Sequence, residues 1–327
     1  MKKTTLLALV IPLGLAGFVV MRVPSFQSVP RPAISFDQAL ERFQDLRVSE
    51  SDLPLRDDGG SLLLHHGRKT ERAFVLLHGL TNCPAQFALL AQILHASGSN
   101  VVVPRARLAG FSDRLNDEQG LQTGQDLVDQ AATGLDIGAG LGDHVSLVGL
   151  SGSAVAVAWI AQNRTGIDDA VLISPFFSLH GAPVPLIDGI AAVLSRIPNF
   201  YLWWDSENKE NLAGPDHAYP RFGTHCMAGT LQLSRNFRAH IAARPLLAKR
   251  VVFLTTATDQ GANNPLTHSI AAQLAARKES HILVHEFPAA LALPHDMIDP
   301  AQPGANTTLA YAKILDLLNV KTPESPG

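Results

Sequence analysis

The chain has 327 residues, of which 26 are Lys or Arg and 29 are Asp or Glu, so its formal net charge is −3. This near balance, with no basic cluster, lacks the electrostatic footprint that nucleic-acid binding requires, and it excludes that class of partner. A chain of this length buries a sizeable core, and α/β folds often stay undivided beyond about 200 residues. We therefore expect one large domain.

The N-terminus departs from this composition, because Lys2 and Lys3 precede an apolar run from Leu6 to Met21. Such a run is typical of an export signal or a membrane anchor. The lysines favour the cytoplasmic side, which places the rest of the chain beyond the membrane, on the periplasmic side in a bacterium. No A-x-A cleavage site follows, which favours an uncleaved anchor. We predict a signal or anchor over residues 1–27 and a catalytic domain over 28–327.

The rest of the sequence alternates between short valine-rich runs and segments with helical spacing of apolar residues. Strands that are apolar on both faces and alternate with helices predict a doubly wound α/β fold with a mostly parallel sheet. In chain order we expect a helix over 36–47, a short strand within 56–67, strands over 73–79 and 100–104 around a helix over 84–98, a helix over 123–142, a strand over 144–150, a helix from Ser153, strands over 169–174, 250–258 and 280–287, and a helix over 307–318.

One segment, at about 175–245, breaks the alternation, because it holds prolines, glycines and the aromatic cluster "NFYLWWD" without a clear strand. An insertion of this length is more often functional than structureless. We interpret it as a helical cap over the carboxyl ends of the strands, where ligands bind in such sheets. Trp203 and Trp204 are candidate substrate contacts; alternatively, they and Tyr201 form the packing core of the cap.

Ser151 lies in "LVGLSGSAV", where a predicted strand gives way to a predicted helix. A nucleophile on a sharp strand-to-helix turn needs small residues two positions away on either side, and Gly149 and Ser153 meet this need. The alternative is that Ser151 is a helix N-cap, which is a common use of serine. The motif therefore needs the support of other residues.

A serine hydroxyl needs a base, and the base needs a group that fixes its tautomer. Asp259 follows a strong apolar run, and His295 lies in the loop after the last predicted strand, so the order is Ser, Asp, His. Alternatively, Asp259 is a turn or capping residue and His295 a surface histidine. Among other acids, Asp296 adjoins His295 and is badly placed to orient it, while Asp299 is a distant second choice.

The loop "LLHGLTN" follows the first long strand. We predict that the amides of Leu80 and Gly152 form an oxyanion hole, with Thr81 as the alternative donor and as a substrate contact. His78 is interpreted as a turn-stabilising residue. The two cysteines, Cys83 and Cys226, either form one disulfide or remain separate buried thiols.

Together, "LLHGLTNCPAQF", "VGLSGS", "TATDQGANNP" and "LPHD" occur in an order that resembles the α/β-hydrolase superfamily over residues 60–320. The chain is most similar to bacterial carboxylesterases and monoacylglycerol-lipase-like serine hydrolases. Two features depart from that pattern: Ser153 replaces the usual final glycine, and "PRARLAGFSD" lacks the Gly-His pair of many relatives. The second departure weakens the analogy with the substrates of those relatives, but it does not affect the assignment of Ser151, Asp259 and His295.

These features predict a serine hydrolase that cleaves carboxylic esters through an acyl-enzyme on Ser151, with Asp259 and His295 and with no metal or organic cofactor. The expected partners are a small-molecule or lipid-like ester substrate and, through the N-terminal segment, a membrane. An acyltransferase or amidase would use the same residues. A catalytically inactive, membrane-tethered binding protein is the alternative of another class.

Overall fold

The computed structural model describes residues 23–212 and 214–320. The apolar run from Leu6 to Met21, on which the anchor prediction rests, lies outside them. Within the described part of the chain, no helix combines the length and the apolar character that crossing a bilayer requires.

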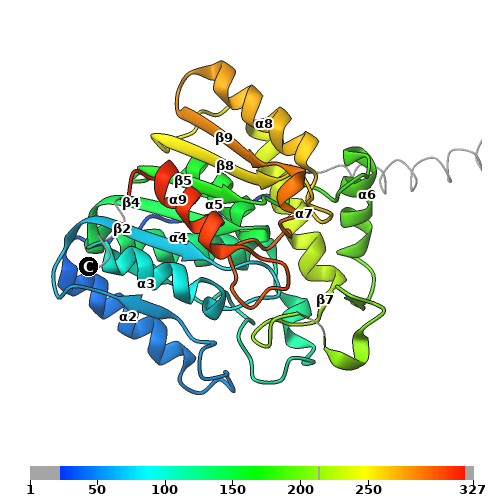
Figure 1. Cartoon of the computed structure of the whole chain (residues 1–327), viewed down its shortest axis with the longest axis horizontal. Helices are drawn as coiled ribbons and strands as arrows, with labels where there is room; N and C mark the ends of the chain where they lie inside the picture. The colour runs from blue at the N-terminus through cyan, green and yellow to red at the C-terminus, as the bar shows by residue number, and fades with distance from the viewer. Residues whose placement is uncertain (1–22, 213, 321–327) are drawn as a thin grey trace, which may run out of the picture.

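The centre of the molecule is a seven-stranded sheet in the order β1-β3-β2-β4-β5-β8-β9 (Figure 1). Every neighbouring pair is parallel except β1 and β3, which are antiparallel. The mostly parallel sheet predicted from the sequence is therefore present. Its strands are β1 (Leu62–Leu64), β2 (Thr70–Leu77), β3 (Asn100–Val103), β4 (Gly142–Leu150), β5 (Asp169–Ile173), β8 (Arg250–Thr256) and β9 (His281–Phe287).

Helices cover both faces of the sheet because the strand side chains alternate between two hydrophobic cores. In β2, Val75 and Leu77 join the core shared with α4, α5 and α7, whereas Phe74 and Leu76 join the core shared with α3 and α9. The α-helices are α2 (Phe36–Glu50), α3 (Ala88–Ala96), α4 (Gly124–Leu141), α5 (Gly152–Asn163), α6 (Val184–Leu194), α7 (Thr224–His240), α8 (Asn264–Arg277) and α9 (Thr307–Leu317).

Helix α8 and a two-stranded hairpin were not predicted from the sequence. Helix α8 joins β8 to β9, and its side chains Ile270 and Leu274 are buried in the core shared with α4 and α5. The insertion also contains a small antiparallel hairpin of β6 (Tyr201–Trp203) and β7 (Arg221–Gly223) between its helices α6 and α7. The insertion is therefore not wholly helical, because the aromatic run adopts extended backbone against β7.

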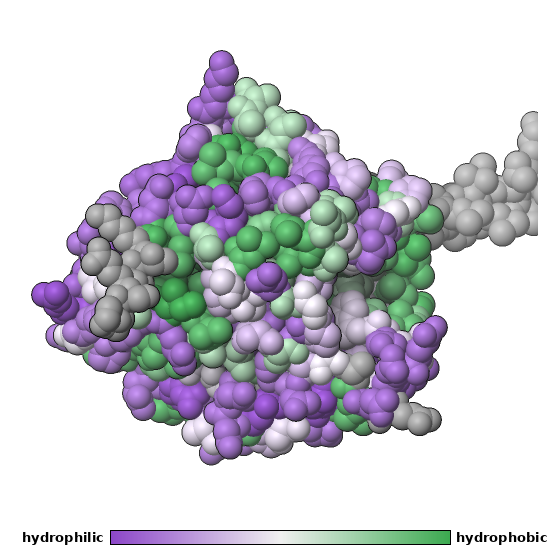
Figure 2. Space-filling view, in the orientation of Figure 1, coloured by the Kyte–Doolittle hydropathy of each residue, from purple (hydrophilic) through white to green (hydrophobic). Residues whose placement is uncertain are grey.

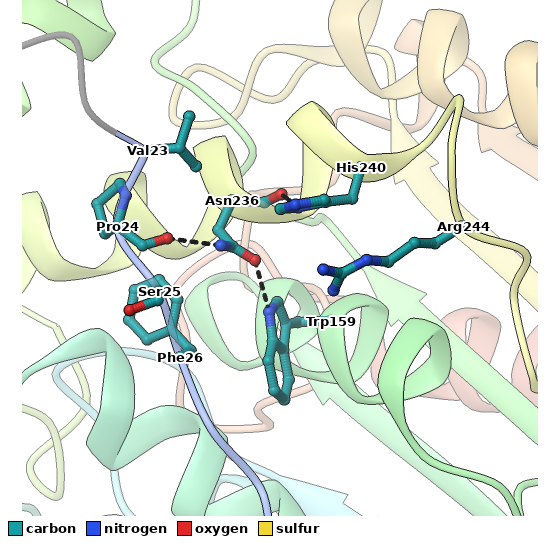
Figure 3. Close-up of a pocket in the computed structure, with 8 residues that line it drawn as sticks. All are labelled: Val23, Pro24, Ser25, Phe26, Trp159, Asn236, His240 and Arg244. Carbon is teal, nitrogen blue, oxygen red and sulfur yellow. Dashed lines mark hydrogen bonds between the residues drawn. The ribbon is translucent and has the colours of Figure 1, made fainter.

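An N-terminal strap, residues 23–35, runs in extended form along α4, α5 and α7. The Asn236 side-chain amide on α7 donates to the Pro24 carbonyl at 2.5 Å and accepts from the Trp159 indole of α5 at 2.8 Å (Figure 3). Further along, the Ala33 amide donates to the Asp136 carbonyl of α4 at 2.8 Å. The Phe26 ring of the strap also packs edge-on against Trp159 of α5, so the strap is attached to all three helices of this layer.

The insertion also carries an exposed apolar stripe. Leu186, Ile190 and Val193 repeat at helical spacing on α6, and Ile197 continues the same face beyond its end. Figure 2 shows hydrophobic residues at the edge of the molecule where Figure 1 places α6. The arrows of β8 and β9 point toward this side of the molecule (Figure 1). The insertion therefore lies near the carboxyl ends of the strands.

Candidate active site

Ser151 connects β4 directly to α5, with φ 57° and ψ −115°. A non-glycine residue rarely adopts this backbone conformation, and it is characteristic of strained functional turns. Ser151 occupies the N-cap position of α5, but its side chain makes no capping hydrogen bond, so the hydroxyl does not serve as a cap. The Ser151 amide donates to the Ile173 carbonyl at 2.9 Å, and its carbonyl accepts from the Phe176 amide at 3.1 Å. The segment that follows β5 thus holds the turn in place.

The small residues on either side of Ser151 have different roles. A Cβ atom on Gly149 would lie 2.8 Å from the Ser153 carbonyl oxygen and from a Val157 methyl, so only glycine fits there. Ser153 is buried, and its hydroxyl donates to the His78 carbonyl at 2.6 Å. Ser153, which stands where the sequence motif usually has glycine, therefore ties the turn at Ser151 to the loop after β2.

His78 stabilises that loop as a neutral side chain. The Ala106 amide donates to its Nε2 atom at 3.0 Å, so the proton resides on Nδ1, which donates to the Gly79 carbonyl at 3.0 Å. Burial lowers the pKa of His78 to about 4. This arrangement agrees with the turn-stabilising role predicted from the sequence.

The two predicted oxyanion donors lie side by side. A Cβ atom placed on Gly152 would be 3.5 Å from the Cβ of Leu80. Gly152 is the first residue of α5, where an amide has no acceptor within the helix. In the described part of the chain, the Leu80 amide donates to no protein acceptor. Both amides are thus free to bind an external oxygen, as a helix start favours.

Thr81 connects the loop after β2 to the insertion. Its hydroxyl accepts from the Trp204 indole at 2.9 Å, and its carbonyl accepts from the Tyr219 amide at 2.8 Å. Trp204 also packs against the Phe222 ring, whereas Trp203 pairs across the hairpin with Arg221. These contacts of Trp204 and Trp203 lie within the insertion and with Thr81, as expected if the two tryptophans serve to pack the cap. A substrate contact by Thr81, Trp203 or Trp204 stays a prediction.

Asp259 and His295, which are far apart in the sequence, are in contact. The His295 Nδ1 atom lies 2.7 Å from the Asp259 Oδ2 atom. The other Asp259 oxygen accepts from the Gly261 and Ala262 amides at 2.8 and 2.9 Å. The Asp259 side chain is completely buried, whereas the His295 side chain is 28% exposed. The carboxylate is therefore fixed in orientation while the imidazole remains accessible.

The pKa values of this pair shift apart. Burial alone would raise the pKa of Asp259, but the His295 charge and the hydrogen bonds outweigh it, so the pKa is lowered. Burial alone would lower the pKa of His295, but the Asp259 charge and hydrogen bond outweigh it, so the pKa is raised above 6.5. Such an opposed pair is typical of a site in which a carboxylate stabilises an imidazolium.

Ser174, which was not predicted, connects the loop of His295 to the turn at Ser151. Ser174 follows Ile173, the residue whose carbonyl accepts from Ser151, and its hydroxyl donates to the His295 carbonyl at 2.8 Å. These contacts place Ser151 and His295 at the same edge of the sheet. The position of Ser174 directly after the apolar run of β5 was the only feature of the sequence that could have indicated this role.

The other two acids near His295 have different partners. Asp299 is buried and lies 2.7 Å from the His217 Nε2 atom, not beside His295. Asp296 accepts from the Gln86 side-chain amide at 2.6 Å, and its pKa is raised to about 6, chiefly by burial and then by Asp299. Of the three acids, Asp259 is thus the one hydrogen-bonded to the imidazole, whereas Asp296 acts on His295 only through its charge. Cys83 and Cys226 are separate buried thiols.

Two hollows of about 260 and 610 Å³ lie along the N-terminal strap. Among the described residues that line them, none is a predicted site residue. The smaller one, drawn in Figure 3, is lined by Val23, Pro24, Ser25, Phe26, Trp159, Asn236, His240 and Arg244. Neither hollow is part of the site around Ser151.

No protein-family model matches the sequence, and no curated protein matches it. Solved structures do match its fold. One is from the work on the metagenome-derived lipolytic enzymes LipS and LipT, with 13% identity and a TM-score of 0.59 over 81% of this chain and 99% of that chain. Another is the monoacylglycerol lipase of Paleococcus ferrophilus, with 17% identity and a TM-score of 0.55 over 79% and 97%.

A third match is a soluble variant of the monoglyceride lipase of Saccharomyces cerevisiae, with 13% identity and a TM-score of 0.57 over 80% of this chain and 92% of that chain. At these sequence identities the similarity shows a shared backbone fold alone. Together with the sheet order and the turn at Ser151, it identifies the architecture. The chain has the α/β-hydrolase fold.

Proposed function

We propose that the protein is a serine hydrolase that cleaves carboxylic esters through an acyl-enzyme on Ser151. The observation that carries the proposal is the strained turn at Ser151, held at the sheet edge where His295 is bound to Asp259. A strained turn that carries a serine at the same sheet edge as a carboxylate-oriented imidazole is typical of a site that activates the serine hydroxyl.

In the proposed reaction, the Ser151 oxygen attacks the ester carbonyl while His295 accepts the hydroxyl proton. Asp259 stabilises the imidazolium that results. The amides of Leu80 and Gly152 donate to the oxyanion of the tetrahedral intermediate. His295 then donates its proton to the departing alcohol, and water, activated by the same imidazole, releases the acyl group from Ser151.

We further propose that the substrate carries a hydrophobic acyl group. The stripe of Leu186, Ile190 and Val193 supports this, because it adds apolar surface to the insertion beside the site. Structural neighbours described as lipolytic enzymes and monoacylglycerol lipases agree with such a substrate.

The test is labelling by a fluorophosphonate probe together with hydrolysis of p-nitrophenyl esters of graded chain length. We expect the protein to be labelled and the Ser151→Ala variant to be unlabelled and inactive. A matched control, Ser269→Ala, removes an exposed serine of α8 and leaves both measurements unchanged. A folded wild-type protein that neither reacts with the probe nor cleaves any ester would instead be a binding protein.

We also propose that residues 1–27 place the domain outside the cytoplasm. Lys2, Lys3 and the apolar run that follows support this orientation. We expect a C-terminal alkaline phosphatase fusion of the full chain to be active in bacterial cells, and one that lacks residues 1–22 to be inactive. Carbonate extraction separates a retained anchor, which stays with the membrane, from a cleaved signal. Equal phosphatase activity of the two fusions would contradict the proposal.

A further inference from the structure

The side chain of Gln86 bridges two loops of the candidate site. Its Oε1 atom accepts from the Gly79 amide at 2.7 Å, and its Nε2 atom donates to the Asp296 carboxylate at 2.6 Å. Gly79 precedes Leu80, the proposed oxyanion donor, and Asp296 follows His295, the proposed base. One amide group therefore spans the distance between the two loops.

The position of Gln86 makes this bridge rigid. Gln86 lies in the 3-10 helix η1 (Pro84–Phe87), which leads into α3, and only 2% of the residue is exposed. A buried amide that is bonded at both ends is costly to move, because each lost bond leaves a polar group without a partner. A shift of either loop would break one of the two bonds.

The surroundings of Asp296 show why an amide, rather than a carboxyl group, suits this position. Asp296 is also bonded by the Asp299 amide at 3.2 Å, and the charged or titratable groups around it are Asp299, His295 and Tyr311. Asp299 in turn binds His217 of the insertion. A second carboxylate in place of the Gln86 amide would face Asp296 directly.

We propose that Gln86 is a positioning residue. By binding Gly79 and Asp296 at once, it fixes the loop that carries Leu80 relative to the loop that carries His295. The inference rests on the proposed esterase function. Gln86 touches neither the nucleophile nor the base, so it acts through Leu80 and His295. Its loss is therefore expected to lower kcat more than it changes KM, because the oxyanion and proton-transfer contacts of the two loops are made in the transition state.

The decisive experiment exchanges the two polar groups. Gln86→Glu alone places two carboxyl groups in contact, and we expect kcat to fall by about 100-fold, the scale of a loop displaced by about 1 Å. The fall is expected to deepen as the pH rises and the pair ionises. In the double variant Gln86→Glu/Asp296→Asn, the new carboxylate accepts both from Gly79 and from the new amide. We expect kcat to recover to within a few-fold of wild type.

Gln86→Leu removes both bonds, and its matched control is Gln162→Leu on α5. Gln162 is a buried glutamine whose amide has no hydrogen-bond partner among the described residues. We expect only Gln86→Leu to lower kcat. If Gln86→Leu fails to fold, the comparison of Gln86→Glu with the double variant Gln86→Glu/Asp296→Asn tests the inference.

The inference is overturned if folded Gln86→Leu keeps the wild-type kcat, or if the double variant is no more active than Gln86→Glu. Probe labelling of Ser151 in the wild-type protein separates this failure from that of the proposed function. A wild-type protein that is neither labelled nor active contradicts the esterase proposal, and this inference with it.

Discussion

Replacing Ser151 by glycine is expected to abolish ester hydrolysis and, at the same time, to make the protein more stable. The hydroxyl is the proposed nucleophile, and loss of such a group lowers kcat by about 10⁶-fold. Its φ of 57° and ψ of −115° cost about 1–3 kcal/mol for a residue with a side chain. Glycine adopts this conformation freely but loses about 0.5–1 kcal/mol of backbone entropy. The net gain in the free energy of unfolding is about 1 kcal/mol.

Denaturant unfolding and ester turnover measure the two effects separately. Ser151→Ala is the matched control, because it removes the hydroxyl and keeps the backbone strain, so it is inactive with nearly wild-type stability. Equal stability of the glycine and alanine variants would show that the turn stores no strain. Esterase activity retained in either variant would show that another residue is the nucleophile.

Replacing Asp259 by asparagine is expected to lower kcat by about 10⁴-fold, as in other sites where a carboxylate orients a histidine. The asparagine no longer stabilises the imidazolium, and it favours the wrong tautomer of His295. His295 must be neutral to accept a proton, so activity rises with pH through its pKa, which lies above 6.5 in the wild-type protein. Without the Asp259 charge, burial lowers that pKa, and the acid limb of the residual activity moves to lower pH.

The pH dependence of kcat/KM for the two proteins measures this shift. Asp299→Asn is the matched control, because it also removes a buried carboxylate, but one that binds His217 instead of His295. We expect a much smaller loss and an acid limb above pH 6.5, as in the wild-type protein. A greater loss in Asp299→Asn than in Asp259→Asn would assign the orienting role to Asp299.

The sheet could be predicted because burial on both faces leaves a local pattern. The runs 73–79 and 250–258 each contain an unbroken apolar stretch, 73–77 and 251–254, and each of these stretches lies in a strand of the parallel sheet. The helix over 123–142 was also predictable from local chemistry, since Thr123 and Asp126 form a capping box at its start. Helix α8 and the β6–β7 hairpin were missed, because alanine-rich and aromatic segments give weaker periodicity.

The contact between Asp259 and His295 was predictable for a different reason. Each follows a strand, and the carboxyl ends of parallel strands meet at one edge of the sheet. The bonds of Ser174 and Gln86 could not be predicted, since they join residues 121 and 210 positions apart by side-chain packing alone. Sequence patterns report the burial of single residues, whereas such pairs depend on the assembled structure. The catalytic roles themselves stay predictions.

The N-terminal strap has a practical consequence for work with the immobilised protein. Phe26 of the strap packs against Trp159 and Pro24 accepts from Asn236, so the strap lies on the helical layer that flanks the sheet and not on the loops around Ser151. A pulling force applied through the strap would therefore be borne by α4, α5 and α7. A protein fixed to a bead or a sensor chip by its N-terminus should keep the edge that carries Ser151 open to reagents.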